Sequence, residues 1–196
     1  MNVFLDGEFA FGLSRITAAW LSVGQVLDEA KIRELQAADE QEVAYQKALH
    51  YLSYRPRSEN EVRGNLRKHN FSDDVILNVI DRLRQNHLVD DLDFAQTWIE
   101  NRSEFRPRGR QALKVELRQK GIAPEVIDTA LQNLDEADFA FRTALKQSRK
   151  YDQLEWPDFR RKLNAFLARR GFNYEIAGPI VKKVWAEIQS AHEPEK

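Results

Sequence analysis

Hydrophobic residues between positions 43 and 190 recur at helical spacing, and their pattern occurs three times. Three blocks align without gaps, offset by 51 and then 50 residues: 61–71, 112–122 and 162–172. Each block places two apolar residues four apart, as in Val62 and Leu66, and ends with asparagine or glycine followed by an apolar residue. A period of this length is typical of tandem supersecondary units.

Polar and special residues between the apolar positions predict where the helices of each unit begin and end. Pro56 stops one helix, because the residue before a proline avoids helical geometry. Ser58 and Glu61 have the spacing of a capping box for the next helix. The next stop needs a left-handed residue, for which Asn70, Gly121 and Gly171 are suited. The third helix is expected to start at Ser72 or Asp73, Pro124 and Asn173.

Each unit also has a leading helix with its own apolar residues. They are Tyr45, Leu49 and Leu52 in the first unit, Phe94, Trp98 and Ile99 in the second, and Phe139, Ala140 and Leu145 in the third. The predicted fold is therefore all-α, with three tandem three-helix, helix-turn-helix-like repeats at 43–90, 91–135 and 136–190. Stacked units of this kind form an elongated, curved rod. Residues 191–196 are predicted to be a disordered tail.

Residues 1–42 lie outside the repeats and are predicted to form a separate extension. Alternation around Asp6-Gly7 predicts a β-hairpin over 2–12 with a type I′ turn, which places Phe4 and Phe9 opposite each other. A short helix is expected at about 13–21, and a longer one with Asp28 as its N-cap. We interpret the extension as a cover for the apolar end of the first repeat.

Composition narrows the class of protein. The chain of 196 residues has no cysteine, which excludes disulfides, thiolate chemistry and cysteine zinc sites. No apolar run has transmembrane length, and the first residues lack the basic and apolar segments of a signal peptide, so a cytoplasmic location is expected. The net charge of −1 combines −5 for residues 1–44 with +4 for the remainder. That imbalance permits an anionic partner.

Catalytic and metal-binding motifs are not found. The histidines, His50, His69, His87 and His192, have no metal-ligand spacing and belong to no nucleophile motif. Glycine-rich phosphate loops and serine nucleophile elbows are missing as well. We therefore expect a protein that is not an enzyme and needs no metal or cofactor.

The second helix of each unit is basic. A solvated face would explain one such helix, but recurrence in three units favours a surface for a phosphate backbone or an acidic filament. Tyr54 and Phe105, each directly before Arg-Pro-Arg, could stack on a base, although core packing is expected for Phe105. The candidate binding residues are Arg55, Arg57, Arg63, Arg67, Lys68, Arg106, Arg108, Arg110, Lys114, Arg118, Lys120, Arg160, Arg161, Arg169 and Arg170.

Three segments together resemble the signature blocks of the RecX family, regulators of the bacterial RecA recombinase. They are Tyr51-Leu-Ser-Tyr-Arg-Pro-Arg-Ser-Glu59, Leu88-Val-Asp-Asp-Leu-Asp-Phe-Ala95, and Arg106-Pro-Arg-Gly109 with Leu117-Arg-Gln-Lys-Gly-Ile122. The resemblance covers roughly residues 43–188. Asn70 and Asn86-His87 stand where the family often has glycine, for which asparagine is a fair left-handed substitute. Trp156-Pro157-Asp158 replaces Arg-Pro-Arg in the third unit.

The resemblance implies a fold of three three-helix repeats and a non-catalytic function. Members of this family bind in the groove of the RecA–DNA filament and limit its ATPase, strand-exchange and co-protease activities in DNA repair and the SOS response. Some bind single- or double-stranded DNA weakly. We expect a monomer that does not bind membranes. Two alternatives stay open, a general DNA-binding helical protein and a helical adaptor for an unrelated protein.

Overall fold

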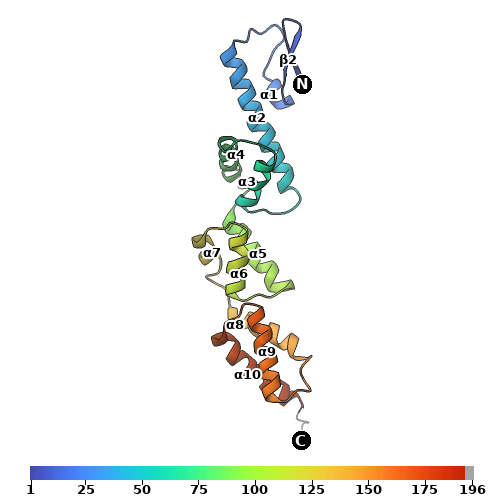
Figure 1. Ribbon diagram of the computed structural model, residues 1–196, viewed down its shortest axis with the longest axis vertical. Helices are drawn as coiled ribbons and strands as arrows, with labels where there is room; N and C mark the ends of the chain where they lie inside the picture. Colours follow the sequence, from blue (N-terminus) through green and yellow to red (C-terminus); the bar gives the residue numbers. More distant parts are fainter. Residues whose placement is uncertain (193–196) are drawn as a thin grey trace. The chain divides into compact units, whose positions relative to one another are not determined.

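The computed structural model describes residues 1–192 and divides the chain into two compact units, Met1–Asp90 and Asp91–Lys196 (Figure 1). The first unit contains β1 (Asn2–Leu5), β2 (Glu8–Gly12), α1 (Arg15–Ala18), α2 (Glu29–Leu52), α3 (Glu59–Lys68) and α4 (Asp73–Gln85). The second contains α5 (Asp91–Phe105), α6 (Arg110–Gln119), α7 (Pro124–Ala130), α8 (Glu136–Ser148), α9 (Trp156–Arg169) and α10 (Tyr174–His192). This is the mostly helical fold with an N-terminal hairpin that the sequence predicts.

The hairpin forms as the sequence predicts. Asp6 and Gly7 have φ values of 50° and 88°, the positive values that a type I′ turn requires at both positions. Phe4 pairs with Phe9, and their ring centroids are 6.0 Å apart in an edge-to-face arrangement. The register shifts between Val3 and Phe4, so the ladder is irregular near its open end.

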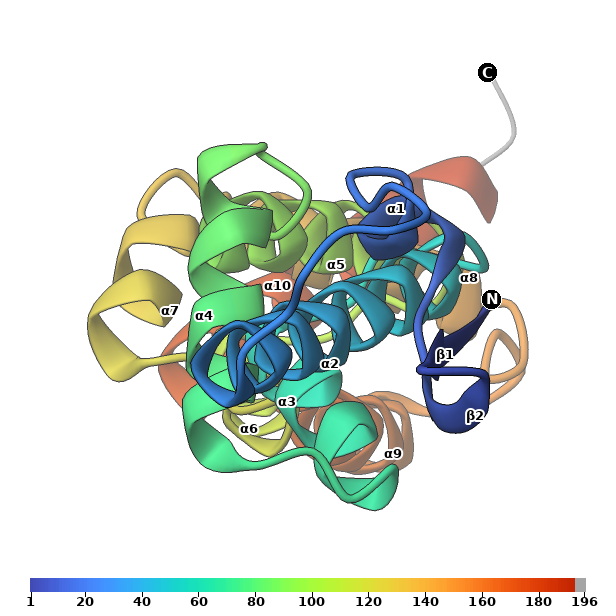
Figure 2. The same cartoon turned by 90° about the horizontal axis from the view of Figure 1, so that it is seen from above.

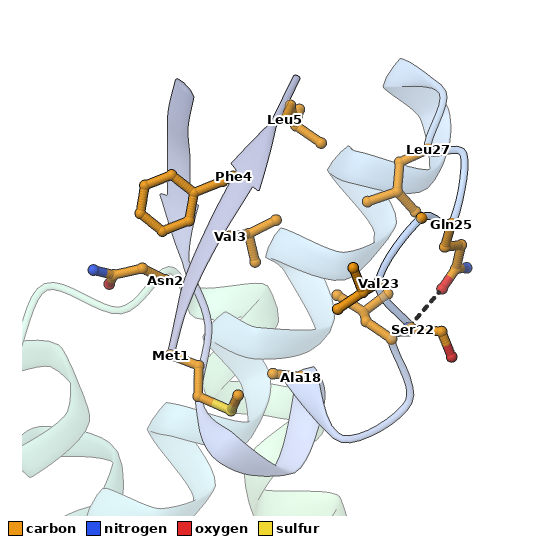
Figure 3. A pocket seen from close by; sticks show the side chains of 12 residues that line it. Met1, Asn2, Val3, Phe4, Leu5, Ala18, Ser22, Val23, Gln25 and Leu27 are labelled. Carbon is orange, nitrogen blue, oxygen red and sulfur yellow. Dashed lines mark hydrogen bonds between the residues drawn. The ribbon is translucent and has the colours of Figure 1, made fainter. Parts of the chain in front are cut away.

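The extension packs on the first half of α2 (Figure 2). Val3 and Leu5 point from β1 toward Val23 and Leu27 of the following loop, while Phe4 points away (Figure 3). Together these segments line a cleft of about 340 Å³. The extension is fastened to α2 where the Ser14 backbone N–H donates to Asp39 Oδ1 at 2.6 Å.

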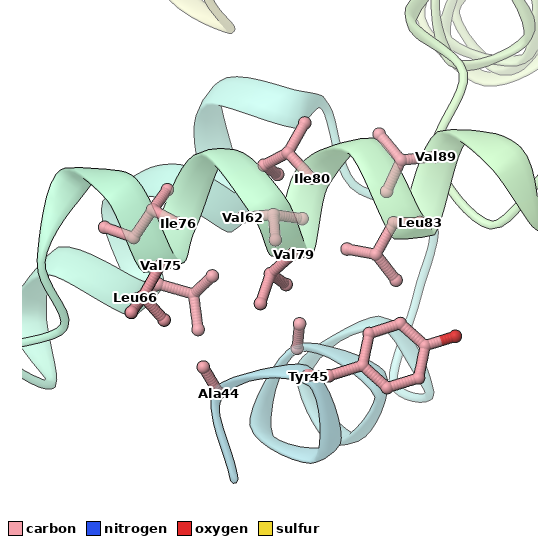
Figure 4. Packing of buried hydrophobic residues seen from close by; sticks show 11 residues of the cluster. Ala44, Tyr45, Val62, Leu66, Val75, Ile76, Val79, Ile80, Leu83 and Val89 are labelled. Carbon is pink, nitrogen blue, oxygen red and sulfur yellow. The ribbon is translucent and has the colours of Figure 1, made fainter. Parts of the chain in front are cut away.

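The core of the first repeat begins at Ala44 and ends at Val89 (Figure 4). Val62 and Leu66 of α3 face Ile76 and Ile80 of α4, and all four side chains are fully buried. Among the described residues, none before Ala44 belongs to this cluster. The extension contacts α2 through α1 and through the Ser14–Asp39 hydrogen bond, and its role as a cover for the first repeat stays a prediction.

The second and third repeats have separate cores built on the same plan. Leu113 and Leu117 of α6 are fully buried in one, and Leu163 and Leu167 of α9 in the other. Pro124 stands at the first position of α7, and the Asn173 side chain caps α10 by accepting from the Ile176 N–H at 2.9 Å. Both starts agree with the prediction.

The helix stops of the three repeats share one geometry. Asn70, Gly121 and Gly171 have φ values of 63°, 79° and 85°. In each repeat the following apolar residue donates its N–H to the carbonyl five residues earlier, as Ile122 does to Leu117 at 3.1 Å. This is the Schellman motif, which satisfies carbonyls that the helix end leaves open. Glycine and asparagine are needed there because a left-handed φ strains other residues.

Three details differ from the sequence prediction. The first leading helix is continuous with the helix before it, because 37–42 are good helix formers although they lack an apolar stripe. After α4 the left-handed residue is His87, with a φ of 55°, and not Asn86. Leu145 is 36% exposed, since Ala140 and Ala144, four residues apart, form the buried face of α8.

The remaining predictions concern boundaries and shape. The starts of α5 at Asp91 and α8 at Glu136 fall where the second and third repeats are predicted to begin. Of the tail predicted at 191–196, α10 includes the backbone of the first two residues, and 193–196 lie outside the described residues. The curved rod stays a prediction.

Candidate basic interface

The basic residues of the first repeat are mostly held by neighbouring groups. Arg55 forms a two-bond pair with Glu61, at 2.9 and 3.1 Å, which raises the pKa of Arg55. Arg63 pairs with Glu59 at 2.8 Å and Arg67 with Asp73 at 3.1 Å. Arg57 lies over the Tyr51 ring at 4.0 Å. Lys68 is exposed and, within residues 1–192, has no ion pair.

Around α6 a single carboxylate organises the basic residues. Glu116, whose side chain is 19% exposed, accepts from Arg102 Nε at 2.6 Å and from the Trp98 indole at 2.9 Å. Arg108 Nε lies 3.5 Å from its other oxygen. Trp98 also has Arg102 and Lys120 over its ring, at 4.5 and 5.0 Å. These cations are held in place by the repeat itself.

Two further basic residues of α6 are also paired. Arg110 lies 3.7 Å from Glu136, and its backbone N–H donates to the same carboxylate at 2.9 Å. Lys114 donates to Asp128 at 2.6 Å, which lowers the pKa of the Asp128 carboxyl, with Arg118 and Arg110 adding to the effect. The contact of Arg110 with Glu136 links the second repeat to the third.

Arg106 and Arg118 are different, because both are exposed and neither forms an ion pair in the part of the chain that the structure describes. Their positive charge is available to an outside partner. The same holds on α9 for Arg160 and Arg169, whereas Arg161 pairs with Asp158 at 2.8 Å and lowers the pKa of that carboxyl. Only some of the candidate basic residues in the second unit are therefore without an ion pair in the described structure.

The turn before α6 packs directly on the end of α9. The Gly109 N–H donates to the Arg170 carbonyl at 2.8 Å. A Cβ at Gly109 would overlap the Gly171 carbonyl, and a Cβ at Gly171 would lie 2.5 Å from the Ala112 Cβ. Backbone meets backbone here, so close approach requires both glycines, and the φ of 85° at Gly171 also favours glycine there by conformation.

This packing gathers three of the candidate arginines. Arg170 Nη1 donates to the Pro107 carbonyl at 3.4 Å, and its guanidinium lies 5.1 Å from the centre of the Phe166 ring. Burial lowers the pKa of Arg170, and the like charges of Arg108 and Arg106 lower it further. The junction of the second and third repeats is therefore crowded with positive charge.

Sequence reasoning missed three basic residues on or just after the leading helix of the third repeat. Arg142 and Lys146 on α8, and Lys150 in the turn just after it, are spaced four apart in sequence and line a cleft with Phe105 and Phe139. Their spacing is the signal that could have revealed them. The expectation that Phe105 packs in a core is wrong, because its side chain is 72% exposed. It is the last residue of α5, six beyond the buried Ile99.

The histidines described have ordinary contacts. His50 Nε2 lies 3.0 Å from the Tyr54 hydroxyl, and His69 Nδ1 lies 2.8 Å from the Asn65 carbonyl. Within residues 1–192, histidine, aspartate and glutamate side chains do not form a group of three that could hold a metal ion. Over the same residues, every helix is too short or too polar to cross a membrane.

Three family models match the chain in sequence: the first, second and third three-helix domains of RecX, at residues 44–83, 90–131 and 135–178. The chain is 32% identical to the regulatory protein RecX of Bacillus pumilus, over all of this chain and 75% of that protein. Against the Bacillus licheniformis protein of the same name it is 30% identical, over all of this chain and 76% of the relative.

Solved structures match as well. A crystal structure of a regulatory protein RecX aligns with a TM-score of 0.75 and 29% identity, covering 91% of each chain. The crystal structure of RecX from Lactobacillus salivarius aligns with a TM-score of 0.69 and 27% identity, covering 75% of this chain and 97% of the other.

Proposed function

This chain is a member of the RecX family, and we propose that it is a non-catalytic regulator of the RecA recombinase. It acts in the cytoplasm as a monomer, binds in the groove of the RecA–DNA filament, and limits ATP hydrolysis, strand exchange and co-protease activity in DNA repair and the SOS response. Its relatives are named regulatory proteins, which supports a role without catalysis.

One observation carries the link between this function and the surface. The repeats use most of their arginines internally but leave Arg106 and Arg118 exposed and unpaired within the described chain. An exposed cation without an acid partner keeps its full attraction for a phosphate or a carboxylate. The acidic and anionic surface of a protein–DNA filament offers both groups.

The decisive measurement is the rate of ATP hydrolysis by RecA from the same organism on single-stranded DNA. The chain should suppress it at substoichiometric or equal concentration. The Arg106→Ala/Arg118→Ala variant should need at least about tenfold more protein for half suppression, because a charge-assisted contact contributes roughly 1.5–3 kcal/mol.

A matched control removes the same charge elsewhere. Lys31→Ala/Arg33→Ala takes two exposed cations from the first half of α2, where each pairs within one turn. It should inhibit RecA like the unchanged protein. Equal inhibition by Arg106→Ala/Arg118→Ala would remove these arginines from the mechanism, and an unaffected RecA would overturn the proposed function.

A general DNA-binding protein is the second candidate, and the crowding of Arg106, Arg108 and Arg170 at one junction favours it. Such a protein would bind duplex DNA tightly without RecA, and its affinity would fall steeply with salt. RecA inhibition that persists when DNA binding alone is weak would exclude this candidate.

A further inference from the structure

A cleft of about 360 Å³ lies between the end of α5, the turn before α6, α8 and α9. The rings of Phe105, Phe139 and Phe166 line it, together with Pro107. Phe105 is 72% exposed, so the hydrophobic core leaves most of this ring uncovered. The cleft has the volume of a small-ligand site, which holds one ring system and not the apolar face of a helix.

Cations line the rim of the same cleft. Arg142 and Lys146 lie four residues apart on α8, which places them on one face about 6 Å apart, and Lys150 follows in the turn just after the end of α8. Arg142 pairs with Asp138 at 2.9 Å, whereas Lys146 and Lys150 have no ion pair within residues 1–192. Glu104 is the one acid among the lining residues.

A guanidinium group already lies over two of the three phenylalanine rings. Arg142 lies over Phe139 at 5.2 Å, and Arg170 lies over Phe166 at 5.1 Å. Cation–π contact holds these groups in place before any ligand arrives. The pKa of Arg170 is lowered by burial and by the neighbouring charges of Arg108 and Arg106. An anion placed beside Arg170 would relieve that repulsion.

The walls also contain one buried polar group that has no hydrogen-bond partner. Thr143 on α8 is 7% exposed, and its hydroxyl has no hydrogen-bond partner in the described structure. A buried hydroxyl without a partner is unfavourable, so a ligand group that bonds to it would gain affinity. It lies in the wall formed by Phe139, Arg142 and Lys146. The cleft thus combines rings, cations and an unused hydrogen-bonding group.

We propose that this cleft takes one unstacked base of a single-stranded nucleic acid, while Lys146, Lys150 and Arg170 contact the phosphates on either side of it. Rings that stack on a base, combined with cations that follow the backbone, are what sequence-independent single-strand binding requires. The inference rests on the proposed function, in which the chain binds the RecA–DNA filament, and it adds where on the chain the DNA strand is contacted and how.

An acidic peptide is the competing occupant, and the cleft suits it less well. Helices and a turn form the walls, so an extended peptide would find no strand edge with which to pair its backbone. A helical peptide buries anchors over two turns, which needs a longer groove than one of about 360 Å³. A base attached to a charged backbone needs one ring site and an open rim.

The test measures binding to fluorescein-labelled oligonucleotides by anisotropy, with no RecA present. Oligothymidylate should bind about 5- to 140-fold more tightly than an abasic strand of equal length, because stacking one base contributes roughly 1–3 kcal/mol. The matching duplex, whose bases are not free, should bind more weakly than the single strand. Equal affinity for the abasic strand or for the duplex would overturn base insertion.

Variants locate the site. Phe105→Ala should reduce the difference between oligothymidylate and the abasic strand to near unity, with little effect on folding because the ring is exposed. Lys146→Ala/Lys150→Ala should lower the slope of log affinity against log salt by about 1.4, since each phosphate contact on a single strand contributes about 0.7. Lys182→Ala/Lys183→Ala removes two charges from α10 and should change neither quantity.

The remaining outcomes each decide the proposal. Unchanged binding by Phe105→Ala and by Lys146→Ala/Lys150→Ala would place the contact elsewhere. Binding of an alternating glutamate–phenylalanine peptide, with no binding of oligothymidylate, would make the cleft a protein site and overturn the proposal. RecA inhibition without any single-strand binding would overturn the cleft assignment and leave the proposed function intact.

Discussion

The turns before α3 and α6 share the sequence Arg-Pro-Arg but use it differently. In the first repeat Arg55 is locked to Glu61, and the buried Ser58 forms a capping box with the same glutamate. In the second repeat Arg106 stands free of ion pairs in the described chain, and Gly109 caps α6 without a side chain. The Arg-Pro-Arg motif therefore pairs with the start of α3 in the first repeat, whereas in the second repeat it leaves the charge of Arg106 unpaired within the described chain.

The difference follows from what packs against each turn. Ala112 occupies the position equivalent to Glu61, and Gly171 of the third repeat lies so close to it that a Cβ at Gly171 would be 2.5 Å from the Ala112 Cβ. Alanine at this position has no carboxylate that could hold Arg106 as Glu61 holds Arg55.

The largest effect is expected from Gly109→Ala. Its new methyl group would overlap the Gly171 carbonyl, so the second unit should lose about 1–3 kcal/mol or more of unfolding free energy, as overpacked sites do. Gly64→Ala on α3 is the control, since nothing lies within 4 Å of its Cβ position and alanine favours a helix by about 0.5–1 kcal/mol. Urea unfolding measures both, and equal stabilisation would refute the account of this contact.

A smaller effect is expected from Ser58→Ala in the first repeat. The substitution removes the hydroxyl that accepts from the Glu61 N–H and should destabilise the protein by about 1 kcal/mol in thermal unfolding. Ser58→Gly, the residue of the second repeat, should lose less, since glycine is a tolerated cap. A neutral Ser58→Ala would show that the capping box contributes nothing here.

Glu61→Gln should make the first turn resemble the second. Glutamine keeps the capping box but gives up the charge that holds Arg55. If the chain binds single strands, the freed arginine should steepen the salt dependence by about 0.7. Glu40→Gln makes the same charge change on α2. A slope that rises equally in both variants would attribute the effect to net charge alone.

The smallest effect concerns how stability depends on pH through one carboxylate–cation pair in each unit. The hydrogen bond from Arg82, with a second from Gln46, lowers the pKa of Glu42, so its stabilisation is present above the unfolded pKa of about 4.3 and is lost as pH falls through the folded pKa. Because Arg82 is half-exposed, Glu42→Gln should reduce this acid-side loss by under about 1 kcal/mol. Asp128→Asn removes a carboxyl whose pKa is also lowered but whose side chain is 65% exposed, so it should reduce the acid-side loss by less than Glu42→Gln does.

Much of the fold can be predicted because helix caps, helix stops and the spacing of apolar residues depend on residues close in sequence. The left-handed stops at Asn70, Gly121 and Gly171 and the caps at Asp28 and Asn173 need only neighbouring residues, and all are confirmed. The sequence does not predict the left-handed conformation of His87, because glycine, and sometimes asparagine, is the residue expected at a left-handed helix stop. Nor does it predict the continuous α2, because residues without an apolar stripe can still propagate a helix.

The site is harder to predict because charge depends on distant partners. The fifteen basic candidates lie on three helices or in the turns beside them, but which of them is free depends on tertiary pairs such as Arg110 with Glu136. Gly109 gives no local sign that it meets Gly171. Lys146 lies on a leading helix and Lys150 just after its end, so both are outside the second helices in which the basic pattern repeats.

Trp98 gives the second repeat an optical reporter. Its indole donates to Glu116 at 2.9 Å, stacks on Phe94 with centroids 5.9 Å apart, and lies under Arg102. Indole emission responds to nearby charge, so a ligand that draws Arg108 from Glu116 would change the colour and yield of this one fluorophore. With Trp20, Trp156 and Trp185 replaced by phenylalanine, the chain would signal events at its Arg-Pro-Arg turn without any attached dye.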